Sequence, residues 1–171
     1  MITGLDCYNK YGDPNTVFDE GLYMVIHEFP EWVREHFPSI PRRIYCNQEL
    51  IVPLIAALQY ILEAGLQEEI KTWDGCFQVR PIRGYEKLVK ELLAQGKIEE
   101  AMIYMSIHSW GVAFDINAAW NGLGKEPQMN LKLVECFEKA GFEWGGRWKR
   151  KDGMHYQLAY LDEHNILYKA S

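Results

Sequence analysis

Apolar residues recur every three to four positions in three segments, and this spacing predicts three helices. The first spans residues 47–67, where Asn47 is a suitable N-cap and Gly65 a suitable stop. The second spans residues 84–96 and the third residues 130–141, and each of these two also ends at a glycine. Because each segment has an apolar stripe, all three helices are expected to pack on a common core.

Strict alternation of apolar and polar positions marks a different kind of segment between the second and third helices. In GVAFDIN (residues 111–117), Val112, Phe114 and Ile116 share one face, while Asp115 lies on the other. The pattern predicts a strand. Packing of its apolar face does not explain why an acidic residue, Asp115, lies on the other face.

A second alternating stretch, DGMHYQL (residues 152–158), places His155 and Gln157 on the face opposite its apolar residues. It belongs to a region, residues 142–160, that is typical of two strands around a polar turn. A further hairpin is expected from residues 69–73 and 76–81, joined at Asp74–Gly75. Helices and strands are mixed without regular alternation, which predicts an α+β fold: a small, mostly antiparallel sheet flanked by helices.

The chain has 171 residues, a length that favours one domain over residues 1–171. Proline and glycine punctuate residues 1–46, so an irregular N-terminal segment is expected before the core of residues 47–160. The net charge of −6 argues against nucleic-acid binding and against attraction to an anionic membrane. The basic cluster RWKRK (residues 147–151) is interpreted as a solvated hairpin tip.

The N-terminus has no basic region followed by an apolar one, so no signal peptide is expected, and synthesis in the cytoplasm is predicted. No apolar run reaches transmembrane length. The four cysteines form no CxxC pair, which favours reduced, structural thiols over a zinc finger.

Three polar residues form a candidate metal site: His108, Asp115 and His155. Two imidazoles and one carboxylate are a ligand set that Zn²⁺ accepts, and they leave a fourth position for water. Either histidine alone is more often structural than metal-binding. All three are expected on polar faces of apolar strands, which places a zinc site on the open face of the sheet. His108 precedes its strand by a turn, where Gly111 can fold the chain back over it.

A peptidase-type zinc site also needs a base, and Asp152 lies three residues before His155. The tripeptide KDG is equally good turn chemistry, so both interpretations of Asp152 stand, with Glu143 as a reserve base. Arg80 precedes a proline, which holds its backbone extended, and it is a candidate for binding an oxyanion or a carboxylate. For Arg83 a surface ion pair is expected.

The stretch SIHSWGVAFD fills the pattern S-x-H-x-x-G-x-A-x-D, and DGMH later places an acid three residues before a histidine. Together with the upstream RP dipeptide, these residues resemble the LAS family of zinc peptidases. That family contains D-alanyl-D-alanine carboxypeptidases and L-alanyl-D-glutamate endopeptidases. The resemblance covers roughly residues 47–160 and is to the branch of VanY-type carboxypeptidases and phage endolysins. It implies a fold of the hedgehog and D-Ala-D-Ala peptidase type.

The resemblance also implies roles for individual residues. One Zn²⁺ per chain would be bound by His108, Asp115 and His155, with Asp152 as the general base. Arg80 would bind the scissile carbonyl oxygen, and Ser106 would help orient the substrate or a ligand. Trp144 and Trp148, beside the second motif, either form a subsite wall or serve in packing. The implied substrate is the stem peptide of peptidoglycan, which the enzyme cuts as a carboxypeptidase or as an endopeptidase. The protein is expected to be a monomer.

Two other functions are weighed against this one. The first is a zinc-stabilised binding or structural module of the same fold without catalysis, and the second is a chance motif without zinc. Because neither a signal peptide nor a wall-binding domain is recognised, the sequence favours a phage lysin or virion component that acts on the cell wall over a resident bacterial enzyme.

Overall fold

The computed structural model describes residues 1–15 and 20–161, and its architecture confirms the α+β prediction. Residues 16–19 and 162–171 of the expected domain lie outside the described residues. The α-helices are α1 (Gly4–Tyr11), α2 (Glu20–Tyr23), α3 (Glu31–His36), α4 (Ile51–Glu63), α5 (Glu86–Ala94), α6 (Ile98–Met102) and α7 (Leu131–Lys139). The strands are β1 (Met24–Glu28), β2 (Arg43–Asn47), β3 (Trp73–Gly75), β4 (Ala113–Ile116), β5 (Phe142–Trp144) and β6 (His155–Leu158).

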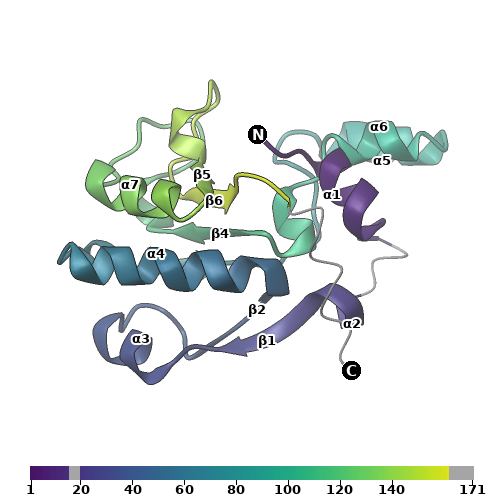
Figure 1. The fold of residues 1–171 in the computed structure, drawn as a ribbon. Coiled ribbons are helices and arrows are strands. Elements are labelled where there is room, and N and C mark those ends of the chain that lie inside the picture. The colour runs from purple at the N-terminus through teal and green to yellow at the C-terminus, as the bar shows by residue number, and fades with distance from the viewer. Residues whose placement is uncertain (16–19, 162–171) are drawn as a thin grey trace.

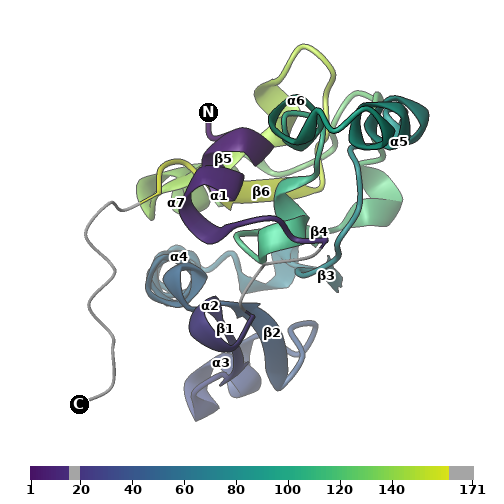
Figure 2. The same ribbon diagram turned by 90° about the vertical axis from the view of Figure 1, so that its right-hand side faces the viewer.

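The strands form two small antiparallel sheets. One has the order β3-β4-β6-β5, and the other is the ribbon of β1 and β2. Helix α4 lies between the larger sheet and this ribbon, and α7 packs against α4 and β5 (Figure 1). Figure 2 shows α1 beside α6 on the side of the sheet away from the ribbon.

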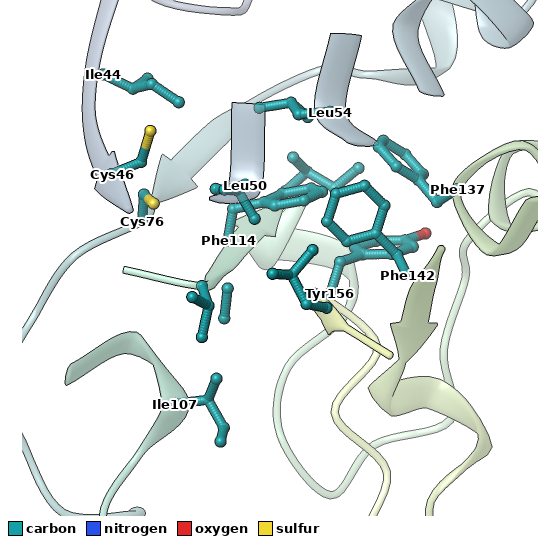
Figure 3. Packing of buried hydrophobic residues seen from close by; sticks show 14 of the residues in the cluster. Ile44, Cys46, Leu50, Leu54, Cys76, Ile107, Phe114, Phe137, Phe142 and Tyr156 are labelled. Carbon is teal, nitrogen blue, oxygen red and sulfur yellow. The ribbon is translucent and has the colours of Figure 1, made fainter. Parts of the chain in front are cut away.

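The core is centred on Phe114 of β4 (Figure 3). Its ring stacks on Trp73, with centroids 5.2 Å apart, and on Tyr156, with centroids 5.5 Å apart. Phe137 from α7 and Phe142 from β5 contact the same ring. The alternation predicted for this strand is therefore confirmed, because its apolar face is the one that meets the core.

The three predicted helices are present as α4, α5 and α7. Asn47 caps a short 3₁₀-helix, η1 (Gln48–Leu50), that leads directly into α4: its side chain accepts a hydrogen bond from the Glu49 amide at 3.1 Å. Before α7, the side chain of Asn130 caps the helix in the same way, accepting from the Lys132 amide at 2.9 Å. Gly65 follows α4 with φ +67°, the left-handed conformation that ends a helix at low cost.

The hairpin expected at residues 69–81 is wrong. Residues 73–75 form β3, but their partner is β4, with Trp73 opposite Ile116. Residues 76–81 carry only an isolated bridge, between Pro81 and Met105. The Asp74–Gly75 pair was interpreted as a turn, and it belongs instead to an irregular edge strand whose register shifts there.

The N-terminal segment is also more ordered than expected. Residues 1–46 contain α1, α2, β1 and α3 and most of β2, although proline and glycine suggested irregular chain. These elements are four to eight residues long, too short for a periodic pattern to stand out. The segment still supplies buried core side chains: Cys7 from α1, and Phe29 and Phe37 from the residues on either side of α3.

The remaining expectations concern thiols, charge and membranes. All four cysteines are free thiols. The basic cluster at residues 147–151 lies near the surface, where Arg147 pairs with Glu138 and Lys151 with Glu126. Across residues 1–15 and 20–161, every helix is too short or too polar to cross a membrane.

Candidate metal centre and active site

Three elements bring His108, Asp115 and His155 together. Asp115 on β4 lies directly opposite His155 on β6 in the strand register. His108 precedes β4, as expected, but it belongs to a 3₁₀-helix, η3 (Ile107–Trp110), and not to a strand face. Gly111 ends η3 with φ +68° and turns the chain back toward β4. Thus the turn, and not a strand face, aims His108 at the other two residues.

Gly111 is required at this turn for two reasons. Its positive φ is strained for other residues. A Cβ atom would also lie 2.8 Å from the amide nitrogen of Asn47 and 2.7 Å from Cε of Met24. The turn that carries His108 is therefore packed tightly against β1 and β2.

The three side chains present one atom each to a common point. His108 Nε2 lies 3.1 Å from Asp115 Oδ1 and 3.1 Å from His155 Nδ1, and the latter two atoms are 3.3 Å apart. A tetrahedral zinc ion with bonds of about 2.0–2.1 Å separates neighbouring ligand atoms by about 3.3 Å. The triangle has the size that such an ion requires.

Hydrogen bonds behind the histidines fix which ring nitrogen carries a proton. His108 Nδ1 lies 2.6 Å from the carbonyl oxygen of Cys76, an acceptor, so this nitrogen donates. His155 Nε2 lies 3.0 Å from Oε1 of Gln157 and donates in the same way. In neutral rings, the other two nitrogens are then unprotonated, and they point with a carboxylate oxygen at one place. Three converging lone pairs fit a bound cation.

The electrostatics of the group agree with this arrangement. Burial raises the pKa of Asp115, but when His108 and His155 carry a proton on the nitrogens that face it, their hydrogen bonds outweigh burial and hold that pKa far below its usual range. Burial lowers the pKa of His155, but Asp115 and Asp152 raise it by more, so the net shift is upward. Asp115 therefore stays negative and attracts either a proton or a metal ion to the histidines. The proton and the metal ion compete for the same lone pairs on the ring nitrogens that face Asp115.

A cavity of about 360 Å³ opens beside the three residues. Residues from the N-terminal segment, from residues 80–85 and from the turn before β6 surround it. The predicted site residues that line this cavity are Arg80, Ser106, Asp115, Trp148, Asp152 and His155. A substrate in this space would contact the candidate metal centre, the candidate base and the candidate oxyanion donor together.

Asp152 forms part of the predicted turn, and it also lines the cavity, where a base would have to lie. Its amide donates to the Gly145 carbonyl at 3.0 Å, and its carbonyl accepts from the His155 amide at 3.2 Å, which makes the turn into β6. Its side chain faces the cavity, and Oδ1 is buried without a hydrogen-bond partner among the described residues. Burial raises the pKa of this carboxyl, and the attraction of His155 offsets only part of the shift.

Glu143, the reserve base, is placed differently. Its Oε1 accepts a hydrogen bond from the indole nitrogen of Trp148 at 2.7 Å. Its Oε2 lies 3.8 Å from the N-terminal amine of Met1. It does not line the cavity, so Asp152 is the better placed of the two acids.

Arg80 is held by its main chain, and among the described residues its guanidinium has no carboxylate partner; Nη1 donates to the Pro81 carbonyl at 3.3 Å. The Ser109 hydroxyl accepts from the Arg80 amide at 3.1 Å and lies 3.2 Å from the Arg80 carbonyl. This joins Arg80 to η3, the element that carries His108. In the described part of the chain, neither Arg80 nor Arg83 forms an ion pair, so the surface pair expected for Arg83 is not found there.

The two tryptophans occupy different environments. Trp148 lines the cavity with its ring centroid 5.2 Å from that of His155. Trp144 is only 5% exposed and does not line the cavity. Its indole nitrogen donates to the Gly153 carbonyl at 2.8 Å, and its ring packs over Gly146. Trp144 thus supports the turn, and only Trp148 reaches the cavity.

Three supporting groups were missed in the sequence: the Cys76 carbonyl, the Ser109 hydroxyl and the Gln157 amide. Strand alternation places Gln157 beside His155, which was a usable signal. The other two depend on contacts between segments about thirty residues apart, and no local pattern indicates them.

Comparisons with known proteins bear on this site. A family model described as D-alanyl-D-alanine carboxypeptidase matches residues 100–158, which contain His108, Asp115, Asp152 and His155. Among solved structures, the L-Ala D-Glu endopeptidase ChiX of Serratia marcescens is similar, with 20% sequence identity over 77% of this chain and 90% of that one and a TM-score of 0.35. No curated protein matches the sequence. The family match over residues 100–158 supports the resemblance noted in the sequence.

Proposed function

We propose that this protein is a zinc-dependent peptidase that hydrolyses a peptide bond in the stem peptide of peptidoglycan. A family-level role as a peptidase that acts on peptidoglycan is supported by the match over residues 100–158. The zinc ion, the bond and the biological setting are our proposal. The observation that carries it is the triangle of His108, Asp115 and His155 at the edge of a cavity that Asp152 also lines.

The ligand set favours zinc over other divalent ions. Two imidazole nitrogens and one carboxylate oxygen leave a fourth tetrahedral position on the cavity side, as catalytic zinc sites require. A zinc ion there would acidify a water molecule and polarise the substrate carbonyl.

The chain's own residues supply the remaining steps. Asp152 accepts a proton from the attacking water and passes it to the departing amine. Its buried carboxylate oxygen has no competing donor among the described residues. The Arg80 guanidinium donates to the scissile carbonyl oxygen as negative charge develops on it. Ser106 and Trp148 line the same cavity and position the peptide.

The bond that is cut distinguishes two forms of this proposal. Purified peptidoglycan is digested with the zinc-loaded protein, and the products are identified by mass spectrometry. Free D-alanine would identify a carboxypeptidase, whereas new D-glutamyl amino termini would identify an L-Ala-D-Glu endopeptidase. No product from any peptidoglycan type, with zinc bound, would refute the proposed activity.

The proposal includes the setting of a phage lysin or virion component, which rests on resemblance to the phage endolysin branch. Production of the protein inside bacteria together with a holin tests it. Lysis is expected for a lysin, and cells that stay intact while the purified protein cleaves their wall would contradict this setting.

The alternative, a zinc-stabilised binding module without catalysis, makes a different prediction: bound zinc, affinity for peptidoglycan and no hydrolysis. Asp152 argues against it. Burying a carboxylate oxygen, Oδ1, that has no hydrogen-bond partner among the described residues costs stability, and a binding module gains nothing from it.

A further inference from the structure

We propose that Gln157 is a positioning residue of the metal centre, and that residues 1–4 are joined to this centre through it. The inference rests on the proposed metal site. It concerns how the chain holds His155 in the state that leaves its metal-facing nitrogen free.

Gln157 follows His155 by two positions on β6, so both side chains point to the same face of the sheet. Gln157 is 1% exposed. Its Nε2 donates to the carbonyl oxygen of Ile2 at 3.2 Å, and its Oε1 lies 3.0 Å from His155 Nε2. Because the Ile2 carbonyl can only accept, the amide has one satisfactory orientation, with its oxygen toward His155.

That orientation decides between two neutral tautomers of His155. The ring has a possible acceptor at each nitrogen: Gln157 Oε1 at Nε2, and Asp115 Oδ1, 3.3 Å away, at Nδ1. A proton on Nδ1 would occupy the lone pair that faces His108 and Asp115. By accepting from Nε2, Gln157 favours the tautomer in which Nδ1 is free for a metal ion.

Helix α1, which begins two residues after Ile2, is itself held in place at both ends. A Cβ atom on Gly4 would come within 2.8 Å of the Met105 carbonyl oxygen and still closer to that of Met102, so α1 lies directly against α6. At the far end of α1, the Trp110 indole donates to the Gly12 carbonyl at 2.9 Å.

Helix α1 is thus fastened at both ends to segments that carry metal-site histidines. Trp110 follows His108 by two residues, and Gln157 follows His155 by two. Residues 1–4 also line the cavity itself. The N-terminus therefore acts as one wall of the site and as the anchor of the Gln157 amide.

The test compares zinc affinity among full-length variants, by competition with a chromophoric chelator. Gln157→Leu removes both hydrogen bonds and is expected to weaken zinc binding by about 10–100-fold. Gln157→Glu keeps an acceptor for His155 Nε2, so it should restore most of that loss. The matched control is Gln95→Leu, a similar change at an exposed residue just after α5, which should not alter the affinity. Unchanged affinity in folded Gln157→Leu would overturn the proposal.

A second measurement needs no variant of Gln157. Nitrogen-15 NMR of the metal-free protein, at a pH where His155 is neutral, should show its proton on Nε2; a proton on Nδ1 would overturn the role of Gln157 even if Gln157→Leu fails to fold. In Co²⁺-loaded protein, Gln157→Leu should also change the visible spectrum, which a loss of general stability would not. Wild-type protein that binds no zinc would refute the proposed function instead.

The N-terminal link has its own variant. Gly4→Ala pushes α1 from α6 and should weaken zinc binding, by less than Gln157→Leu. Gly122→Ala is the control, because its Cβ would meet only Lys125, at an ordinary distance of 3.5 Å. If folded Gly4→Ala binds zinc with wild-type affinity, residues 1–4 have no part in holding the metal centre.

Discussion

Replacing Asp152 by asparagine separates metal binding from catalysis. The change removes the charge and the proton-accepting oxygen but nearly preserves the shape of the side chain. The main-chain hydrogen bonds of Asp152, to the Gly145 carbonyl and from the His155 amide, do not depend on its side chain. Oδ1 has no partner to lose among the described residues. The turn and the zinc ligands should therefore stay in place.

The loss of activity should be large. A positioned general base typically contributes roughly 10²–10⁴-fold to the rate, or about 2.7–5.4 kcal/mol at about 1.36 kcal/mol per factor of ten. Asp115 is the other carboxylate among the described residues that line the cavity, and it is occupied as a ligand. Glu143 is engaged by Trp148 outside the cavity. With no substitute for the base, the upper part of this range is expected.

Although the activity of Asp152→Asn should fall, the thermal stability of its metal-free form should rise. Burial raises the pKa of Asp152 above its ordinary value of 3.8. A carboxyl whose pKa is raised by folding stabilises the fold most below that ordinary value and loses the contribution as the pH rises through its folded pKa. At pH 7, metal-free Asp152→Asn should therefore melt at a higher temperature than wild type. The difference should shrink below pH 3.8, and also when zinc is added at pH 7.

The assay follows product release from peptidoglycan, zinc content, and melting of the metal-free protein at pH 7 and pH 3. Glu68→Gln removes one exposed charge and is the control. Full activity in zinc-loaded Asp152→Asn would refute the role as base. Loss of zinc from this variant would instead make Asp152 a ligand.

Three further predictions concern the metal, the oxyanion donor and the turn. Zinc at a thousandfold excess over its Kd should stabilise wild type by about 4.1 kcal/mol, which corresponds to a rise in Tm of roughly 8–16 °C; His155→Ala should lose this rise. Arg80→Ala should lower kcat by about 10²–10³-fold while zinc content is unchanged, and a loss of zinc would contradict the role of Arg80. Gly111→Ala should cost more than the ~1–2 kcal/mol of a left-handed residue, because its Cβ meets the Asn47 amide; an unchanged Tm would show that the turn can relax.

What the sequence predicts well are the features that repeat over several residues. The three longer helices and the alternating strand at Phe114 carry periodic patterns, and both Asp115 and His155 follow from alternation. The bend at Gly111, which aims His108, also follows from the sequence, but its close approach to the Asn47 amide is visible only in the structure. The support of Arg80 by Ser109 joins segments 29 residues apart. Such long-range contacts have no local signature. For the same reason, the sequence does not show that Trp148 lines the cavity while Trp144 packs beneath the turn.

The metal centre and the aromatic core depend on the same strand pairing. In the β4–β6 register, the pair Phe114–Tyr156 is adjacent to the pair Asp115–His155. A slip by one residue would turn the apolar side chains to the cavity and the ligands to the core. The stack of Phe114 on Tyr156, with rings 8° from parallel, opposes that slip. The packing of one face of the sheet therefore fixes which atoms meet on the other. For this reason, we expect core substitutions at Phe114 to weaken zinc binding, although the ring does not touch the ligand atoms.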